Sequence, residues 1–177
     1  MDLTQLSANL LTRDQQLVHT KYFTSRISSP KGKRERQSTY IEALETLDNL
    51  SIHYGHYLRS PRECRSCGSV VDVPSEKMTD VNIAVELLTD AFQNNFDTAL
   101  LISADSDLTA PIVSVRRLFP QKNVVIGFPP ERSSEALKKV ATRWFPIWRV
   151  VFAKSQLPPK VARKSDGFIL ERPSSWR

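Results

Sequence analysis

The sequence contains little cysteine and no long apolar run, and each of these absences narrows the class of protein. Two cysteines in 177 residues cannot form a disulfide framework, which favours a reducing environment. No apolar stretch approaches the roughly 20 residues that a helix needs to span a bilayer, and the N-terminus lacks the basic and apolar regions of a secretory signal. We therefore expect a cytoplasmic protein without a membrane segment.

Basic residues outnumber acidic residues, 25 to 19, which gives a formal net charge of +6. A surface of this sign attracts polyanions. The length and the 40% hydrophobic content are sufficient for one core. We expect a single domain over residues 1–155, followed by a basic, proline-bearing, flexible tail over residues 156–177.

The order of apolar and polar residues predicts helices that alternate with strands. Helices are expected over residues 3–11, 36–50, 79–93, 107–119 and 133–143, and strands over 17–27, 51–58, 98–103, 123–128 and 147–152. This alternation favours an α/β fold of three layers, in which helices flank a mostly parallel sheet. The run Leu100-Leu101-Ile102 does not alternate, which is typical of a strand buried on both faces.

Two aspartates directly follow this apolar run. Asp105 and Asp107 lie at the expected carboxyl end of the strand, where open α/β sheets bind ligands. Asp80 lies at the start of the preceding helix, which covers about 21 Å. The strand then runs back over about 20 Å. We therefore expect Asp80 and Asp105 to meet, although they are far apart in the sequence.

Carboxylates that gather at one edge need a cation or water between them. Their oxygens suit Mg²⁺ or Mn²⁺, and such an ion can orient a phosphodiester, activate a water and neutralise charge in the transition state. Simpler roles stay open for two of the three residues. Asp107 can cap the next helix, and Asp80 can interact with the helix dipole. Asp105 has no such role, so it is the strongest candidate for a metal ligand.

Several segments together resemble the NYN domain family, which has the PIN-like ribonuclease fold. They are Tyr22-Phe23-Thr24-Ser25-Arg26, Arg36-Gln37 with Tyr40 and Ala43-Leu44, Glu76 to Ala84, Ser103 to Leu108 with Pro111, and Phe128-Pro129-Pro130-Glu131-Arg132. The resemblance implies a metal-dependent endoribonuclease that cleaves single-stranded RNA. Asp80, Asp105 and Asp107 match the family's acidic positions, which implies that they bind Mg²⁺ or Mn²⁺ and carry catalysis. Whether the protein forms a homo-oligomer is left open by the sequence.

The chain departs from the family pattern in two places. The family's Ser-Gly-Asp is Ser103-Ala104-Asp105 here. NYN domains also normally open with a strand that ends in an aspartate, whereas Met1-Asp2-Leu3 resembles the segment after that strand. We therefore expect an N-terminally truncated NYN domain that lacks a central strand and one metal ligand. The alternative function is an RNA-binding or partner-binding module with an incomplete metal site.

Five basic residues are candidates for RNA binding. Arg26 and Arg132 follow strands that are expected to end at the same edge as Asp105, where they can contact phosphates. Lys31, Lys33 and Arg34 lie in an expected basic loop that can steer RNA. An ordinary solvated surface is the alternative reading for all five residues.

The segment His53 to Cys67 contains an H-x₂-H and a C-x₂-C pair, which are residue types that bind zinc. His53 and His56 lie three apart in an expected strand and so point to opposite faces. This disfavours a complete zinc site from one chain. Cys64 and Cys67 are then either an ordinary loop feature or a zinc-binding pair that a partner completes.

The segment Asp105-Ser106-Asp107 after an apolar strand also resembles the first motif of haloacid-dehalogenase-like phosphatases. In that family the first aspartate is a covalent nucleophile. The motif normally opens the domain, with lysine and acidic motifs well downstream, and little of this chain follows Asp107. The phosphatase reading is therefore disfavoured.

Overall fold

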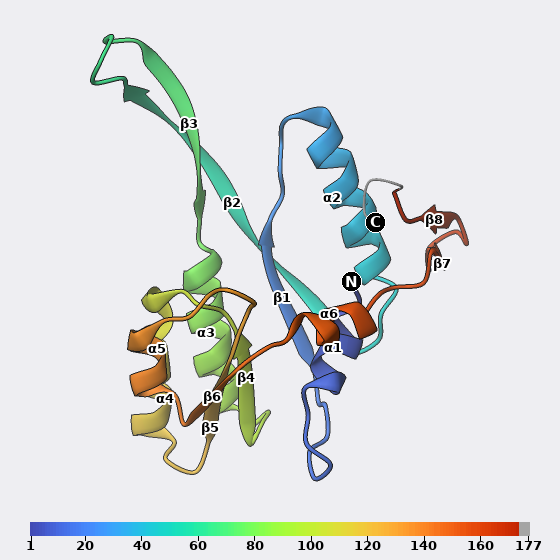
Figure 1. The fold of residues 1–177 in the computed structure, drawn as a ribbon, viewed down its shortest axis with the longest axis vertical. Coiled ribbons are helices and arrows are strands. Elements are labelled where there is room, and N and C mark those ends of the chain that lie inside the picture. Colours follow the sequence, from blue (N-terminus) through green and yellow to red (C-terminus); the bar gives the residue numbers. More distant parts are fainter. Residues whose placement is uncertain (174–177) are drawn as a thin grey trace.

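The computed structural model describes residues 1–173, and its strands form two three-stranded sheets and one small two-stranded sheet (Figure 1). In the first sheet β1 is parallel to β2, and β2 is antiparallel to β3. The second sheet is parallel throughout, in the order β4-β5-β6. The bounds of these strands are β1 Thr20–Ser25, β2 Leu50–Glu63, β3 Val70–Lys77, β4 Thr98–Ile102, β5 Asn123–Phe128 and β6 Arg143–Pro146.

Parallel strands flanked by helices confirm the predicted α/β class. The main core lies between the second sheet and the helices α3 (Thr79–Phe92), α4 (Thr109–Leu118) and α5 (Glu135–Val140). Its buried side chains come from the helices and from β5, and they are Leu87, Ala91, Leu108, Ile112, Val115, Val124, Ile126, Phe128 and Leu137. The strand β5 is central and buried, because β4 and β6 cover both of its edges.

Strand β4 is less buried than its apolar sequence predicts. It lies at the edge of its sheet, its first four residues are partly buried, and Ile102 is 38% exposed. Strand β1 is likewise an edge strand of the first sheet. Helix α3 contacts β1 and also packs its Leu87 and Ala91 in the core of the second sheet. The two sheets are therefore joined through α3, and no strand pairing links β1 to β4 within residues 1–173.

The antiparallel pairing of β2 with β3 forms a long hairpin that projects away from the rest of the molecule (Figure 1). The pairing extends from His56 opposite Lys77 to Glu63 opposite Val70. The sequence predicts only residues 51–58 of this hairpin as a strand. Strand β3 is missing from the prediction because Asp72, Pro74 and Ser75 break up its apolar character.

Two further segments differ from the predicted elements. Helix α2 spans Lys31–Leu44, so Lys31, Lys33 and Arg34 belong to its first turn and not to a loop. Pro30 precedes the helix as its cap residue, a position where the missing N–H of proline costs no helical hydrogen bond. The last strand of the second sheet is β6, whereas part of the predicted 147–152 strand forms the helix α6 (Arg149–Lys154).

The segment from Gln156 onward also differs from the predicted flexible tail. It contains the hairpin of β7 (Lys160–Ala162) and β8 (Ile169–Glu171), and its Leu157 and Leu170 pack against α2. Arg163 forms an ion pair with Glu42 of α2 at 2.7 Å. Leu157 and Leu170 therefore give this basic segment an apolar face that is buried against α2.

The N-terminal helix α1 (Leu3–Asn9) lies beside α6. Asp2 caps α1, since its carboxylate accepts a hydrogen bond from the backbone N–H of Gln5 at 2.8 Å. Its own N–H donates to the carbonyl of Ser155 at 2.8 Å, which ties the start of the chain to the end of α6. Every helix in residues 1–173 is too short or too polar to span a bilayer.

Candidate functional site

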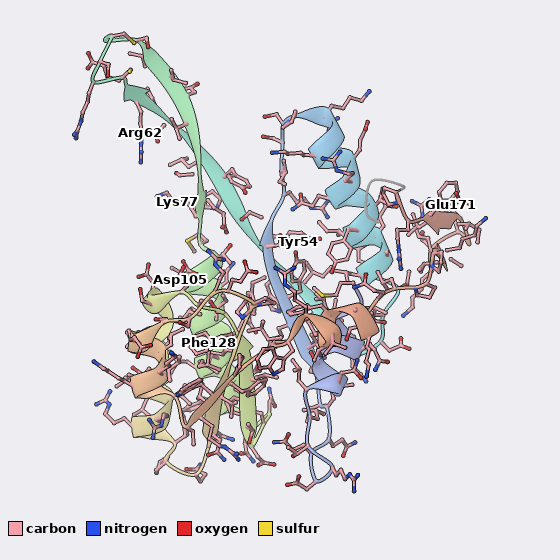
Figure 2. The ribbon with its side chains drawn as sticks, in the orientation of Figure 1. Tyr54, Arg62, Lys77, Asp105, Phe128 and Glu171 are labelled. Atoms are coloured by element: carbon pink, nitrogen blue, oxygen red, sulfur yellow. The ribbon has the colours of Figure 1, made fainter. Side chains whose placement is uncertain are left out.

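Four carboxylates lie together where β3 leads into α3 and where β4 leads into the short 3₁₀ helix η1 (Ser106–Leu108). Asp80 lies in the first turn of α3, and Glu76 lies near the end of β3. Asp105 caps η1, and Asp107 lies within it. Figure 2 shows Asp105 at this edge, at the foot of the β2–β3 hairpin. We call these four residues the acidic cluster.

The other three members of the acidic cluster repel the carboxylate of Asp80. Partial burial raises the pKa of Asp80, and the negative charges of Asp105, Asp107 and Glu76 raise it further. Helix α3 and η1 are in contact, so residues far apart in the sequence lie at one place in the fold. The charges that act on Asp80 are therefore predominantly negative.

Local hydrogen bonds fix the position of Asp105. Its Oδ1 accepts a hydrogen bond from the backbone N–H of Asp107 at 3.1 Å, and its own N–H donates to the Ser103 hydroxyl at 3.1 Å. Asp105, and not Asp107 as the sequence suggested, is therefore the capping residue here. The second oxygen of Asp105 takes no part in the cap.

The donor set of the acidic cluster consists of carboxylate oxygens, which suit Mg²⁺ or Mn²⁺. In residues 1–173, no three His, Cys, Asp or Glu side chains are arranged to hold one metal ion in common. Mg²⁺ commonly uses only one or two carboxylates and completes its shell with water or substrate phosphate oxygens. The carboxylate oxygens of the cluster are of the type that an ion held in this open manner uses.

A crowded junction lies behind the acidic cluster. The Ser25 hydroxyl at the end of β1 donates to Glu76 Oε1 at 2.9 Å. A Cβ atom added at Gly55 would lie 2.6 Å from the Ser25 Oγ, 2.6 Å from the Lys77 carbonyl oxygen and 2.8 Å from the Thr79 Oγ1. Only glycine fits at position 55. The ends of β1 and β3 and the start of α3 are therefore in close contact, which positions Glu76 and Asp80.

An arginine and a tyrosine form a platform next to this junction. The Arg26 guanidinium lies 4.6 Å from the centroid of the Tyr54 ring, and its Nη2 donates to the Tyr54 hydroxyl at 3.1 Å. Asn82 of α3, two residues beyond Asp80, donates from Nδ2 to the Tyr54 carbonyl at 3.1 Å. The platform is thus tied to the same turn of α3 as the acidic cluster. A cation and an exposed aromatic face are suited to a phosphate and a base.

The other predicted RNA-binding residues lie elsewhere. Arg132 lines a cavity of about 730 Å³ at the carboxyl ends of β5 and β6, together with Trp148 and Arg149. Lys31, Lys33 and Arg34 lie at the start of α2, which Figure 1 shows well apart from the start of α3. Lys31 forms an exposed ion pair with Glu35 at 3.7 Å. Of the five basic candidates, Arg26 alone has a contact that ties it to the first turn of α3 in the described residues.

The two histidines among the predicted zinc-binding residues lie far from the two cysteines along the hairpin. His53 stacks on Phe23 at the base of the hairpin, with ring centroids 4.9 Å apart. Cys64 and Cys67 are exposed and free at the hairpin tip. A hydrogen bond between the Ser69 hydroxyl and the Cys67 thiol lowers the pKa of that thiol. The two histidines and two cysteines therefore do not form a four-residue site within one chain.

Sequence reasoning missed Glu76, Ser25, Gly55 and Tyr54 as site residues. Glu76 precedes Asp80 by four positions in a segment for which no helix or strand was predicted, so its position relative to the cluster could not be inferred. Ser25 and Tyr54 lie on the two parallel strands β1 and β2, and Thr24 is paired with Tyr54. The one signal available was that these strands run side by side and carry polar residues at corresponding ends.

The protein has an α/β fold with parallel strands flanked by helices, and this fold carries the acidic cluster described above. The model of the NYN domain matches residues 2–147, and the chain belongs to the NYN domain family. No curated protein matches the chain. Its structure is similar to the crystal structure of a protein of unknown function from Vibrio parahaemolyticus, with a TM-score of 0.54 and 18% identity over 83% of this chain and 78% of that one. At this identity the likeness shows the fold alone.

Proposed function

We propose that the protein is a metal-dependent endoribonuclease that hydrolyses phosphodiester bonds of single-stranded RNA at the acidic cluster. The observation that supports this function is the gathering of Asp80, Asp105, Asp107 and Glu76 at one exposed edge. Membership of the NYN family, whose fold is that of PIN-like ribonucleases, agrees with it. The negative charges of the cluster give a divalent cation a reason to bind there.

Each residue of the cluster has a proposed role. Asp105 and Asp80 bind Mg²⁺ or Mn²⁺, and a bound ion of this kind polarises a phosphodiester and lowers the pKa of a bound water. Asp107 orients the attacking water by accepting a hydrogen bond from it. Glu76 adds negative charge and is itself held by the Ser25 hydroxyl.

The Arg26–Tyr54 platform is proposed to hold the RNA next to the cluster. The Tyr54 ring offers a face on which a base can stack, and the Arg26 guanidinium can contact a backbone phosphate. Neither contact reads base identity, so cleavage depends little on sequence. Lys31, Lys33, Arg34 and Arg132 contribute through long-range attraction of the polyanion.

We also infer that β1 and β4 can accept a further parallel strand between them, because each lies at the edge of its sheet. Both are edge strands, and α3 packs on both sheets. The family normally opens with a strand that ends in an aspartate. A strand of that kind between β1 and β4 would join the two sheets and add a carboxylate to the acidic edge.

A second function is favoured by the arrangement of the ligands. Because no three ligating side chains in the described residues share one metal position, the chain also fits an RNA-binding or partner-binding module without catalysis. In that case the Arg26–Tyr54 platform binds RNA, and the acidic cluster does not cleave it.

The test is cleavage of a labelled single-stranded RNA in the presence of Mn²⁺. Three proteins are compared: the unsubstituted chain, Asp105→Asn, and Asp97→Asn. Asp97 directly precedes β4, at the opposite end from Asp105, so it is a matched control for the loss of one charge. We expect cleavage by the chain and by Asp97→Asn, and a loss of at least ~100-fold in Asp105→Asn.

A fourth protein carries an N-terminal extension designed as an apolar strand ending in aspartate. Cleavage by this extended protein alone would mean that the added strand is required for activity. Binding of the RNA without cleavage by any of the four proteins would support the binding module. Equal cleavage by Asp105→Asn would contradict the proposed nuclease site.

A further inference from the structure

The tip of the β2–β3 hairpin holds both cysteines of the chain on one tight turn. The backbone N–H of Cys64 donates to the Ser69 carbonyl at 2.8 Å, and the N–H of Gly68 donates to the Cys64 carbonyl at 2.8 Å. Gly68 has a φ of 69°, a left-handed conformation that glycine adopts without strain. The turn therefore closes the C-x₂-C-G sequence with both exposed thiols on it, and the side chains of Cys64 and Cys67 are in hydrogen-bond contact.

A thiol pair with this spacing is one half of a tetrahedral zinc site. Structural zinc is bound by four ligands, commonly cysteines in C-x₂-C pairs, with Zn–S distances of about 2.3 Å. Two further ligands are needed. The chain has no other cysteine, and its histidines at 53 and 56 lie on the lower part of the hairpin. Within residues 1–173 no third residue joins the pair.

We propose that Cys64 and Cys67 form half of a zinc site and that a second copy of this chain supplies the other half. One Zn²⁺ then joins two hairpin tips related by a two-fold axis, and each tip provides two thiolates. The tip projects away from the rest of the molecule, so a second tip can approach it without contact between the two domains (Figure 1). An isologous pair of identical tips supplies four equivalent ligands.

The charges around the tip favour this arrangement. Four thiols lose four protons as they bind, and the resulting centre of Zn²⁺ and four thiolates carries a net charge of −2. Arg65 lies between the two cysteines, and Arg62 is on β2 close to the tip (Figure 2). Two copies thus bring four guanidinium groups to a centre of negative charge. The same groups would repel one another if no metal were present.

Exposed apolar side chains beside the tip also favour a second copy. Val70 is 66% exposed and Val71 is 56% exposed, although both begin a strand directly after the thiol turn. A second tip that shares the metal would cover part of this surface. The occupant is a second copy because the same segment supplies the two missing thiols, the cations that offset the negative metal centre, and the apolar cover.

The experiment measures zinc content and molecular mass together on the full chain. Chelator-treated protein in a reducing buffer is titrated with Zn²⁺, and its mass is followed by light scattering. We expect one zinc per two chains and a doubling of the mass. Co²⁺ in place of Zn²⁺ should give intense thiolate-to-cobalt charge-transfer absorption and the visible bands of a tetrahedral site. Four sulfur neighbours are expected by X-ray absorption.

Matched variants separate the thiols from the rest of the turn. Cys64→Ser and Cys67→Ser should each lose the zinc and remain monomeric, whereas Ser66→Ala in the same turn should behave as the unsubstituted chain. Asp105→Asn should also bind zinc and dimerise normally, so the result does not depend on the nuclease proposal. Far-ultraviolet circular dichroism checks that each variant folds.

Any of four outcomes would overturn the proposal. One is a single zinc on each monomer, which would mean that one chain completes the site. The second is a chain that retains no zinc at micromolar concentration, and the third is a chain that retains it equally after both cysteines are replaced. The fourth is zinc-dependent association with a different protein, but not with a second copy.

Discussion

Replacing Asp80 by asparagine should stabilise the folded protein, because it removes one charge from a cluster of like charges. Burial and the charges of Asp105, Asp107 and Glu76 raise the pKa of Asp80. Repulsion between exposed charges contributes about 0.2–1 kcal/mol for each pair. The dipole of α3 acts in the opposite direction and favours a carboxylate in the first turn by about 0.3–1 kcal/mol. Repulsion from three neighbouring charges outweighs the helix-dipole contribution, and we expect the free energy of unfolding to rise by about 0.5–1 kcal/mol.

The pH dependence has a definite sign. Asp80 has a raised pKa in the folded state, so its ionised form destabilises the fold above that pKa. The advantage of Asp80→Asn is therefore fully present at neutral pH and disappears as the pH falls below the ordinary value of 3.8. For a chain of this size the melting temperature should rise by roughly 1–4 °C at pH 7.

Asp90 provides the matched control on the same helix. Its carboxylate lies 2.6 Å from the Lys21 ammonium, so Asp90→Asn removes a partly buried ion pair. The free energy of unfolding of this variant should fall by about 1 kcal/mol, whereas that of Asp80→Asn should rise, although both variants replace aspartate by asparagine. Both variants are compared by thermal melting at pH 7 and near pH 3. Destabilisation by Asp80→Asn at pH 7 would refute the like-charge cluster.

Three further changes test other parts of the structure. Gly55→Ala should destabilise the fold by about 1–3 kcal/mol in chemical denaturation, because its Cβ would collide with backbone and side-chain atoms of the junction; a neutral result would mean that the junction is loose. Tyr54→Ala should weaken single-stranded RNA binding by roughly tenfold in fluorescence anisotropy, whereas Tyr54→Phe, which keeps the ring, should bind nearly as before. Leu170→Ala should lower the free energy of unfolding by about 2 kcal/mol and make residues 160–171 accessible to protease. Unchanged proteolysis would contradict the packing of the C-terminal hairpin.

The sequence predicts the part of the site that depends on regular elements. A helix and a strand of matched length bring their outer ends together, which is why Asp80 and Asp105 could be placed near each other from spacing alone. The apolar run of β4 located the carboxyl end of that strand. Its partial exposure was not predictable, because the degree of burial of a strand depends on whether it lies at the edge or in the centre of its sheet.

The errors arise where tertiary contacts decide the structure. The pairing of β3 with β2 compensates for the weak strand character of its residues, and it brings Glu76 to the cluster. The C-terminal hairpin is held by Leu157, Leu170 and the ion pair of Arg163 with Glu42, which no local pattern indicates. The start of α2 at Lys31 was the one error that local rules could have avoided, since Pro30 marks a helix start.

Binding of Mn²⁺ to the acidic cluster in the absence of RNA tests the central claim most directly. The free Mn²⁺ is measured by electron paramagnetic resonance during titration of the chain and of Asp105→Asn, with Asp97→Asn as the control. We predict saturable binding to the chain and to Asp97→Asn, and binding weakened at least ~10-fold in Asp105→Asn. Identical titrations for all three proteins would show that the acidic cluster does not bind the ion.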